Sequence, residues 1–177
     1  REAGLPTRTV QSYYDILENT LIGCRLEPHV RSARRRMVAH QKFYLFDTGV
    51  TNAINRRLGA PPDAALRGRL FEQLMVLEAM RMLDYRHGEA QLFFWRTSGG
   101  AEVDLVVEHH GRPIAAFEIK AKKRIAGADL TGLRAYRDEY PRVPLAVVCD
   151  APEPHEMEGI RIMPWSIFLG DLPRILG

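Results

Sequence analysis

The alternation of apolar and polar residues along the chain predicts a mixture of helices and strands. Apolar side chains recur at helical spacing in residues 7–19, where Thr7 stands at the capping position, and again in residues 66–84. Shorter helices are expected at 50–58, 129–139 and 165–169. Apolar or alternating runs predict strands at 21–26, 42–46, 91–97, 102–108, 113–120, 143–149 and 159–163.

The longest periodic segment runs from Leu66 to Asp84 and predicts a buried amphipathic helix. Its apolar stripe consists of Leu70, Leu74, Leu77, Met80 and Leu83. From this helix onward the order of elements is helix, three strands, helix, strand. That order predicts an α/β sandwich, in which an antiparallel meander is followed by a crossover helix and a further strand of the same sheet.

Acidic residues face one another in the predicted hairpin formed by residues 102–108 and 113–120. A hairpin that is symmetric about Gly111, with residues 109–112 as its turn, pairs Asp104 with Glu118 and Glu102 with Lys120. Strand side chains alternate between faces, so these four project from the same side of the sheet. Facing Cβ atoms lie about 5 Å apart, and two carboxylates at that spacing repel unless a positive charge lies between them. Mg²⁺, which prefers oxygen ligands, is the natural occupant, with a lysine beside it.

A third acid is expected on the long helix, where Glu72 and Glu78 are the candidates. Glu72 lies one helical turn after Gly68, which leaves room for an approach to the sheet. A simpler interpretation is that the hairpin is half-exposed and that Glu102, Asp104, Glu108 and Lys120 form its polar face. In that case Glu102 and Lys120 are an ordinary cross-strand ion pair.

Composition and charge place the chain among globular proteins with a basic N-terminal part. The 177 residues are 46% hydrophobic, and two cysteines fit neither a disulfide framework nor a zinc pattern, so a reducing, cytoplasmic location is expected. No signal peptide and no apolar run of about 20 residues is present, so no membrane partner is expected. The six histidines suggest no ligand cluster, because His109 and His110 should point to opposite faces of a turn. A basic cluster that can neutralise phosphates, or simply form a solvated loop, consists of Arg31, Arg34, Arg35, Arg36 and Lys42.

The helix, the two strands and the basic loop of residues 1–48 fit the last part of a winged helix. The alternative is that this segment only packs against the main domain of residues 49–177. Because no Gly-Lys pair occurs anywhere, this portion contains no Walker A phosphate loop.

The spacing of the acids resembles the PD-(D/E)xK nuclease superfamily. The residues that carry the resemblance are Gly68-x-x-Phe71-Glu72, Glu102-Val-Asp104 and Glu118-Ile-Lys120. The chain is more closely similar to the C-terminal domain of prokaryotic AAA-type ATPases known as DUF4143. That similarity covers about residues 7–170 and includes Lys42-Phe-Tyr-Leu-Phe-Asp-Thr-Gly49, Phe94-Trp-Arg-Thr97 and Phe117-Glu-Ile-Lys120.

The resemblance implies a restriction-endonuclease-like αβββαβ core with a mixed sheet and a metal site. Asp104, Glu118 and the backbone carbonyl of Ile119 would hold Mg²⁺ or Mn²⁺, with Glu72 completing the shell, and Lys120 would orient water or stabilise charge on a phosphate. It also implies an ATPase portion upstream in the same polypeptide. Candidate DNA contacts are Arg31, Arg34, Arg35, Arg36, Lys42, Arg96, Lys122 and Lys123.

Three functions therefore compete. The first is a metal-dependent nuclease-like domain that acts on DNA phosphodiesters. The second is a non-catalytic DNA- or protein-binding module that regulates the ATPase. The third is an oligomerisation domain, with a second copy of the chain as its partner.

Overall fold

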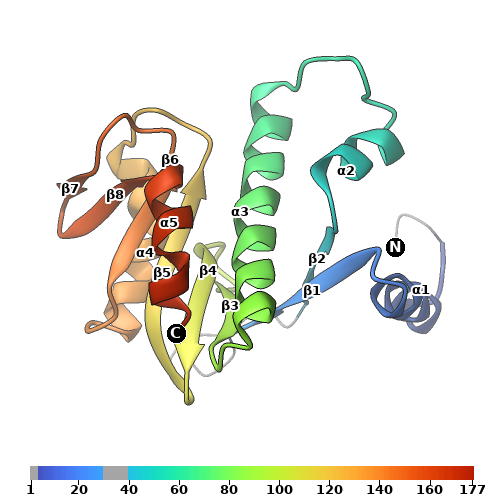
Figure 1. The fold of residues 1–177 in the computed structure, drawn as a ribbon, viewed down its shortest axis with the longest axis horizontal. Coiled ribbons are helices and arrows are strands. Elements are labelled where there is room, and N and C mark those ends of the chain that lie inside the picture. The colour runs from blue at the N-terminus through green and yellow to red at the C-terminus, as the bar shows by residue number, and fades with distance from the viewer. Residues whose placement is uncertain (1–3, 30–39) are drawn as a thin grey trace.

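The computed structural model describes residues 4–29 and 40–177, which form one mixed eight-stranded sheet with helices packed on both faces (Figure 1). The helices are α1 (Thr7–Asn19), α2 (Thr48–Ile54), α3 (Ala64–Arg86), the 3₁₀ helix η1 (Gly127–Leu130), α4 (Thr131–Glu139) and α5 (Trp165–Ile175). The strands are β1 (Gly23–Pro28), β2 (Lys42–Leu45), β3 (Gln91–Arg96), β4 (Glu102–His109), β5 (Arg112–Lys120), β6 (Leu145–Cys149), β7 (His155–Met157) and β8 (Ile160–Pro164). The predicted α/β class with a mixed sheet is confirmed.

The strands follow the order β2-β1-β3-β4-β5-β6-β8-β7 across the sheet. β3, β4 and β5 form the predicted antiparallel meander. α4 then crosses to β6, which pairs in parallel with β5, and β8 pairs in parallel with β6. β7 is a short antiparallel edge strand that the sequence pattern missed, because its three residues are mostly exposed and lack an apolar run.

Each face of the sheet has its own hydrophobic core. On one face α3 and α5 supply Met75, Val76 and Phe168, which pack against the β4–β5 hairpin. On the other face α4 supplies Leu133 and Tyr136. Because both faces are covered, the interior of β4 and every residue of β6 are buried, which explains the apolar run predicted for a doubly covered strand.

The predicted apolar stripe of α3 is only partly correct. Leu77 lies in the core, but Leu74 is 39% exposed, while Met75 and Val76 are fully buried. α3 packs against α5 as well as the sheet, so its buried surface is wider than one stripe and displaced from the one expected.

The N-terminal elements extend the central sheet. β1 pairs antiparallel with β2 and in parallel with β3. α1 has no buried residue and is tied to β1 by ion pairs from Arg25 to Asp15 (2.5 Å) and Glu18 (2.6 Å). Pro6, not Thr7, occupies the capping position, and no side chain caps the helix. The predicted winged-helix origin of residues 1–48 stays a prediction; Arg31, Arg34, Arg35 and Arg36 lie outside the described residues.

Within residues 4–29 and 40–177, no helix combines the length and the apolar character needed to cross a bilayer.

Candidate functional site

The turn of the β4–β5 hairpin differs from the predicted one, yet the predicted pairing of acids survives. The turn has two residues, His110 and Gly111, with φ angles of 48° and 77°, as a tight primed turn requires. A bulge next to Glu108 then shifts the register by one residue. Leu105 therefore faces Phe117, so that Asp104 comes next to Glu118 when the same register continues. The predicted four-residue turn was wrong. The turn is centred between His110 and Gly111, not on Gly111, and the bulge restores the register that symmetry about Gly111 predicted.

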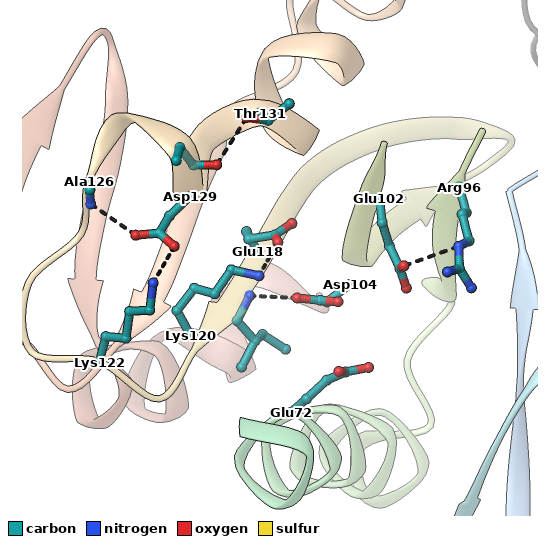
Figure 2. Close-up of polar contacts among 12 residues, drawn as sticks. Glu72, Arg96, Glu102, Asp104, Glu118, Lys120, Lys122, Ala126, Asp129 and Thr131 are labelled. Atoms are coloured by element: carbon teal, nitrogen blue, oxygen red, sulfur yellow. Dashed lines mark hydrogen bonds and ion pairs between the residues drawn. The ribbon is translucent and has the colours of Figure 1, made fainter. Parts of the chain in front are cut away.

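Asp104 and Glu118 are both buried, with 5% and 6% of their surface exposed. Asp104 Oδ2 accepts a hydrogen bond of 2.8 Å from the backbone N–H of Ile119, and the Lys120 ammonium donates to Glu118 Oε1 (Figure 2). Glu118 Oε2 is buried and has no hydrogen-bond partner among the described residues. This burial contradicts the interpretation of a half-exposed hairpin, and Glu102 pairs with Arg96 at 3.2 Å rather than with Lys120.

The surroundings of the two acids oppose their ionisation. Burial raises the pKa of Asp104, and the negative charge of Glu72 raises it further. Burial likewise raises the pKa of Glu118, and the charge of Asp104 adds to the effect. Burial would lower the pKa of Lys120, but the charge and hydrogen bond of Glu118 and the charge of Asp104 together outweigh it, and the net pKa is raised. The cluster is thus short of positive charge around Glu118.

β2 places two polar side chains beside these acids. We call the group formed by Glu72, Glu102, Asp104 and Glu118 the acidic cluster. The ammonium of Lys42 lies 2.7 Å from Glu72, 2.6 Å from Glu102 and 3.4 Å from Asp104. Tyr44 donates a 2.7 Å hydrogen bond to the Glu72 carboxylate from the same face of the strand. Burial alone would lower the pKa of Lys42, but Asp104 and the other neighbouring charges raise it overall, so the ammonium remains charged.

The acids do not close around a single point. Among the described residues, only Glu89, His109 and His110 form a group of three metal-ligand side chains whose ligand atoms lie within 4.8 Å of one another. The expectation that His109 and His110 point to opposite faces of the turn was therefore wrong. In the acidic cluster, Lys42 already serves as the counter-ion of Glu72 and Asp104.

Two adjoining hollows meet at Glu72, Asp104 and Lys120. One has a volume of about 440 Å³ and is also lined by Glu118 and by Gly132 of α4. The other, of about 480 Å³, is also lined by basic and small residues, among them Arg67, Gly68, Arg69 and Lys122. The acids are therefore accessible to a cation and to a larger, negatively charged ligand.

The profile of a domain of unknown function, DUF4143, matches residues 67–168. The chain belongs to the DUF4143 family. Residues 1–63 match a second domain of unknown function, DUF8612. The chain is similar to uncharacterized proteins of Mycobacterium bovis and Mycobacterium tuberculosis, each 32% identical over 130 residues, which cover 68% of this chain and 26% of the relative. It thus spans about a quarter of their length. No solved structure matches the chain.

The site takes residues from both matched regions. Glu72, Asp104, Glu118 and Lys120 all lie within the DUF4143 match, whereas Lys42 lies in the DUF8612 match. In the sequence analysis Lys42 is placed among the candidate DNA contacts and Tyr44 only within a motif of the family resemblance. The sequence shows only that the polar residues Lys42 and Tyr44 alternate along a short strand. This alternation does not identify the acids that they contact.

The other predicted residues have partners of their own or remain exposed. Glu78 binds Arg81 at 2.5 Å, which leaves Glu72 as the helix acid of the cluster. Lys122 binds Asp129 at 2.6 Å and borders the basic hollow. Lys123 is exposed, and Arg96 is tied to Glu102 while remaining 47% exposed.

Gly132 is a site residue that the sequence analysis missed. It lies in the first turn of α4, where an added Cβ atom would come within 1.7 Å of the Glu102 backbone oxygen and 3.3 Å of Glu118 Oε2. Only glycine therefore lets α4 approach the acids this closely.

Replacing Gly132 with alanine is expected to lower the free energy of unfolding by about 1–3 kcal/mol, because the backbone must move apart to accept the methyl group. Gly68→Ala is the matched control, since Gly68 is also helical but has no atom within 4 Å of the added Cβ. That control should raise stability by up to about 1 kcal/mol through helix propensity. Urea unfolding measures both. Equal effects of the two substitutions would contradict the close approach of α4.

Proposed function

We propose that the chain is a metal-dependent, nuclease-like domain that acts on DNA phosphodiesters, and that an ATPase portion belongs to the same polypeptide. The observation that carries the proposal is the buried oxygen of Glu118. It lies beside Asp104 without a hydrogen-bond partner in residues 4–29 and 40–177, and both carboxyls have raised pKa values. A divalent cation would supply the missing positive charge and permit both to ionise.

The donor types of these residues suit a hard cation such as Mg²⁺ or Mn²⁺, and the acids would have to draw closer together to bind it. Asp104, Glu118 and the carbonyl of Ile119 would hold it, and Glu72 would contribute through water or directly, which gives the all-oxygen set such ions prefer. When bound, the ion would polarise a phosphate and lower the pKa of a water molecule.

Lys120 and the basic hollow supply the remaining chemistry. The Lys120 ammonium, held at Glu118, lies at the edge of both hollows, where it can stabilise negative charge that develops on a phosphate. Arg67, Arg69 and Lys122 line the hollow beside it and offer charges to neighbouring phosphates of a backbone. This combination supports a phosphodiester polymer as substrate, and DNA is the substrate that the resemblance implies.

Supercoiled plasmid DNA incubated with the chain and Mn²⁺ or Mg²⁺ tests the proposal. We expect nicking by the wild-type chain and none by an Asp104→Asn/Lys120→Met variant that keeps its circular dichroism spectrum. Glu72→Gln should slow cleavage, whereas Glu78→Gln, on the same helix but bound to Arg81, should not. Cleavage that survives unchanged in the double variant would refute the nuclease proposal.

A non-catalytic, DNA-binding regulatory module is the second candidate, and it is favoured by Lys42, which already neutralises three carboxylates. In this case DNA binding would persist in Asp104→Asn, would need no divalent ion, and would weaken steeply with added salt. Fluorescence anisotropy with a labelled duplex in EDTA distinguishes it from the first candidate.

A further inference from the structure

A second group of metal-ligand side chains lies at the tip of the β4–β5 hairpin, at the opposite end of β4 from the acidic cluster. Glu89 precedes β3, His109 ends β4, and His110 opens the turn. Glu89 Oε2 lies 3.8 Å from His109 Nε2 and 3.3 Å from His110 Nε2. We propose that these three side chains bind a divalent transition-metal ion, with Zn²⁺ as the representative.

The backbone explains why two successive histidines converge. Neighbouring side chains of a strand point to opposite faces, which is why the sequence predicted divergence. His110, however, has a φ of 48° as the first turn residue, and this conformation brings its ring to a centroid separation of 4.0 Å from that of His109. Pairing of Gln91 with Glu108 holds the start of β3 beside the hairpin tip, so Glu89 is close by.

The spacing suits a tetrahedral ion. Ligand atoms about 2.1 Å from a tetrahedral zinc ion lie about 3.4 Å from one another. The two measured separations from Glu89, 3.3 and 3.8 Å, bracket that value, and all three ligand atoms lie within 4.8 Å of one another. Small side-chain rotations would therefore complete three corners, and water would fill the fourth.

The ligand types separate this site from the acidic cluster. Two imidazoles and one carboxylate suit Zn²⁺, Ni²⁺ or Cu²⁺, whereas Mg²⁺ and Ca²⁺ prefer oxygen ligands alone. The side chains are also 36% (His109), 70% (His110) and 71% (Glu89) exposed, so an ion can enter without any rearrangement of the core. A bound ion would tie the segment before β3 to the hairpin tip.

Isothermal titration of the tag-free chain with ZnCl₂ and, separately, MgCl₂ tests the site. We expect one Zn²⁺ ion per chain at this location, and at least about tenfold weaker binding in His110→Asn or Glu89→Gln. Asparagine tolerates the positive φ of His110, so this variant preserves the turn. His155→Gln, which removes a histidine of β7, is the matched control and should leave Zn²⁺ binding unchanged.

Asp104→Asn separates the two metal sites, because it should leave Zn²⁺ binding at the hairpin tip intact whatever happens to DNA cleavage. With Co²⁺ as a spectroscopic probe, the visible absorption of a tetrahedral ion should appear in the wild-type chain and be lost in His110→Asn. The inference is overturned if Zn²⁺ does not bind, if it binds His110→Asn and the wild-type chain equally, or if Asp104→Asn alone abolishes binding.

Discussion

Replacing Lys42 with methionine is expected to lower the free energy of unfolding of the metal-free chain by about 3 kcal/mol and to tighten its binding of Mn²⁺. Removing one partner of a buried ion pair costs about 3–5 kcal/mol, because the remaining charges lose their compensation. The lower figure applies here since Lys42 and Glu72 retain 19% and 24% exposure. Mn²⁺ binding improves because the ammonium competes with the ion for Glu72 and Asp104.

Urea unfolding in EDTA and calorimetric titration with Mn²⁺ measure the two effects. Lys122→Met is the matched control: Lys122 also pairs with a carboxylate, Asp129, but is 54% exposed. We expect it to cost less than about 1 kcal/mol and to leave Mn²⁺ affinity unchanged. If Lys42→Met stays folded yet binds Mn²⁺ more weakly, Lys42 supports the acidic cluster and does not compete with the ion.

The parts of the fold that depend on local pattern could be predicted from the sequence. Alternation in β4 and β5 identified the hairpin, and the apolar run of β6 identified a doubly covered strand. The pairing of Asp104 with Glu118 followed from the position of Gly111. This prediction succeeded only because the bulge offsets a turn that is centred between His110 and Gly111 and not on Gly111. A bulge leaves no clear mark in a single sequence.

The parts of the site that depend on tertiary packing could not be predicted. Lys42 reaches Asp104 across the sheet although the residues are far apart in sequence, and no spacing rule connects them. Gly132 matters because of the backbone opposite it, which appears only when α4 is docked. His110 converges on His109 because of one positive φ angle, which strand alternation cannot anticipate.

The charge balance of the acidic cluster depends on a lysine from a different matched region. The acids belong to the DUF4143 match, while their counter-ion belongs to β2 in the DUF8612 match. A displacement of β2 would remove positive charge from Glu72 and Asp104 and leave them free to bind a metal ion. The charge balance of the cluster is thus linked to the position of the N-terminal strands.

The stability of the metal-free chain is expected to fall as the pH rises from about 5 to about 8, and Glu118→Gln should remove most of this fall. Burial, and then the charge of Asp104, raise the pKa of Glu118 to about 8; burial, and then the charge of Glu72, raise that of Asp104 to about 6. A carboxyl whose pKa is higher in the folded state stabilises the fold fully below its unfolded pKa. That contribution is lost as the pH rises through the folded pKa.

The size of the effect follows from the same linkage. Each tenfold change in acid dissociation corresponds to about 1.4 kcal/mol, so the difference in pH dependence between the wild type and Glu118→Gln should amount to a few kcal/mol. Urea unfolding in EDTA at several pH values measures it, with Glu78→Gln as a control that should retain the wild-type slope. In the wild type, Mn²⁺ affinity should rise over the same pH interval, because binding requires both acids to lose their protons. A difference between wild type and Glu118→Gln that is constant with pH would show that Glu118 is already ionised in the folded chain, and the argument for a missing cation would then fail.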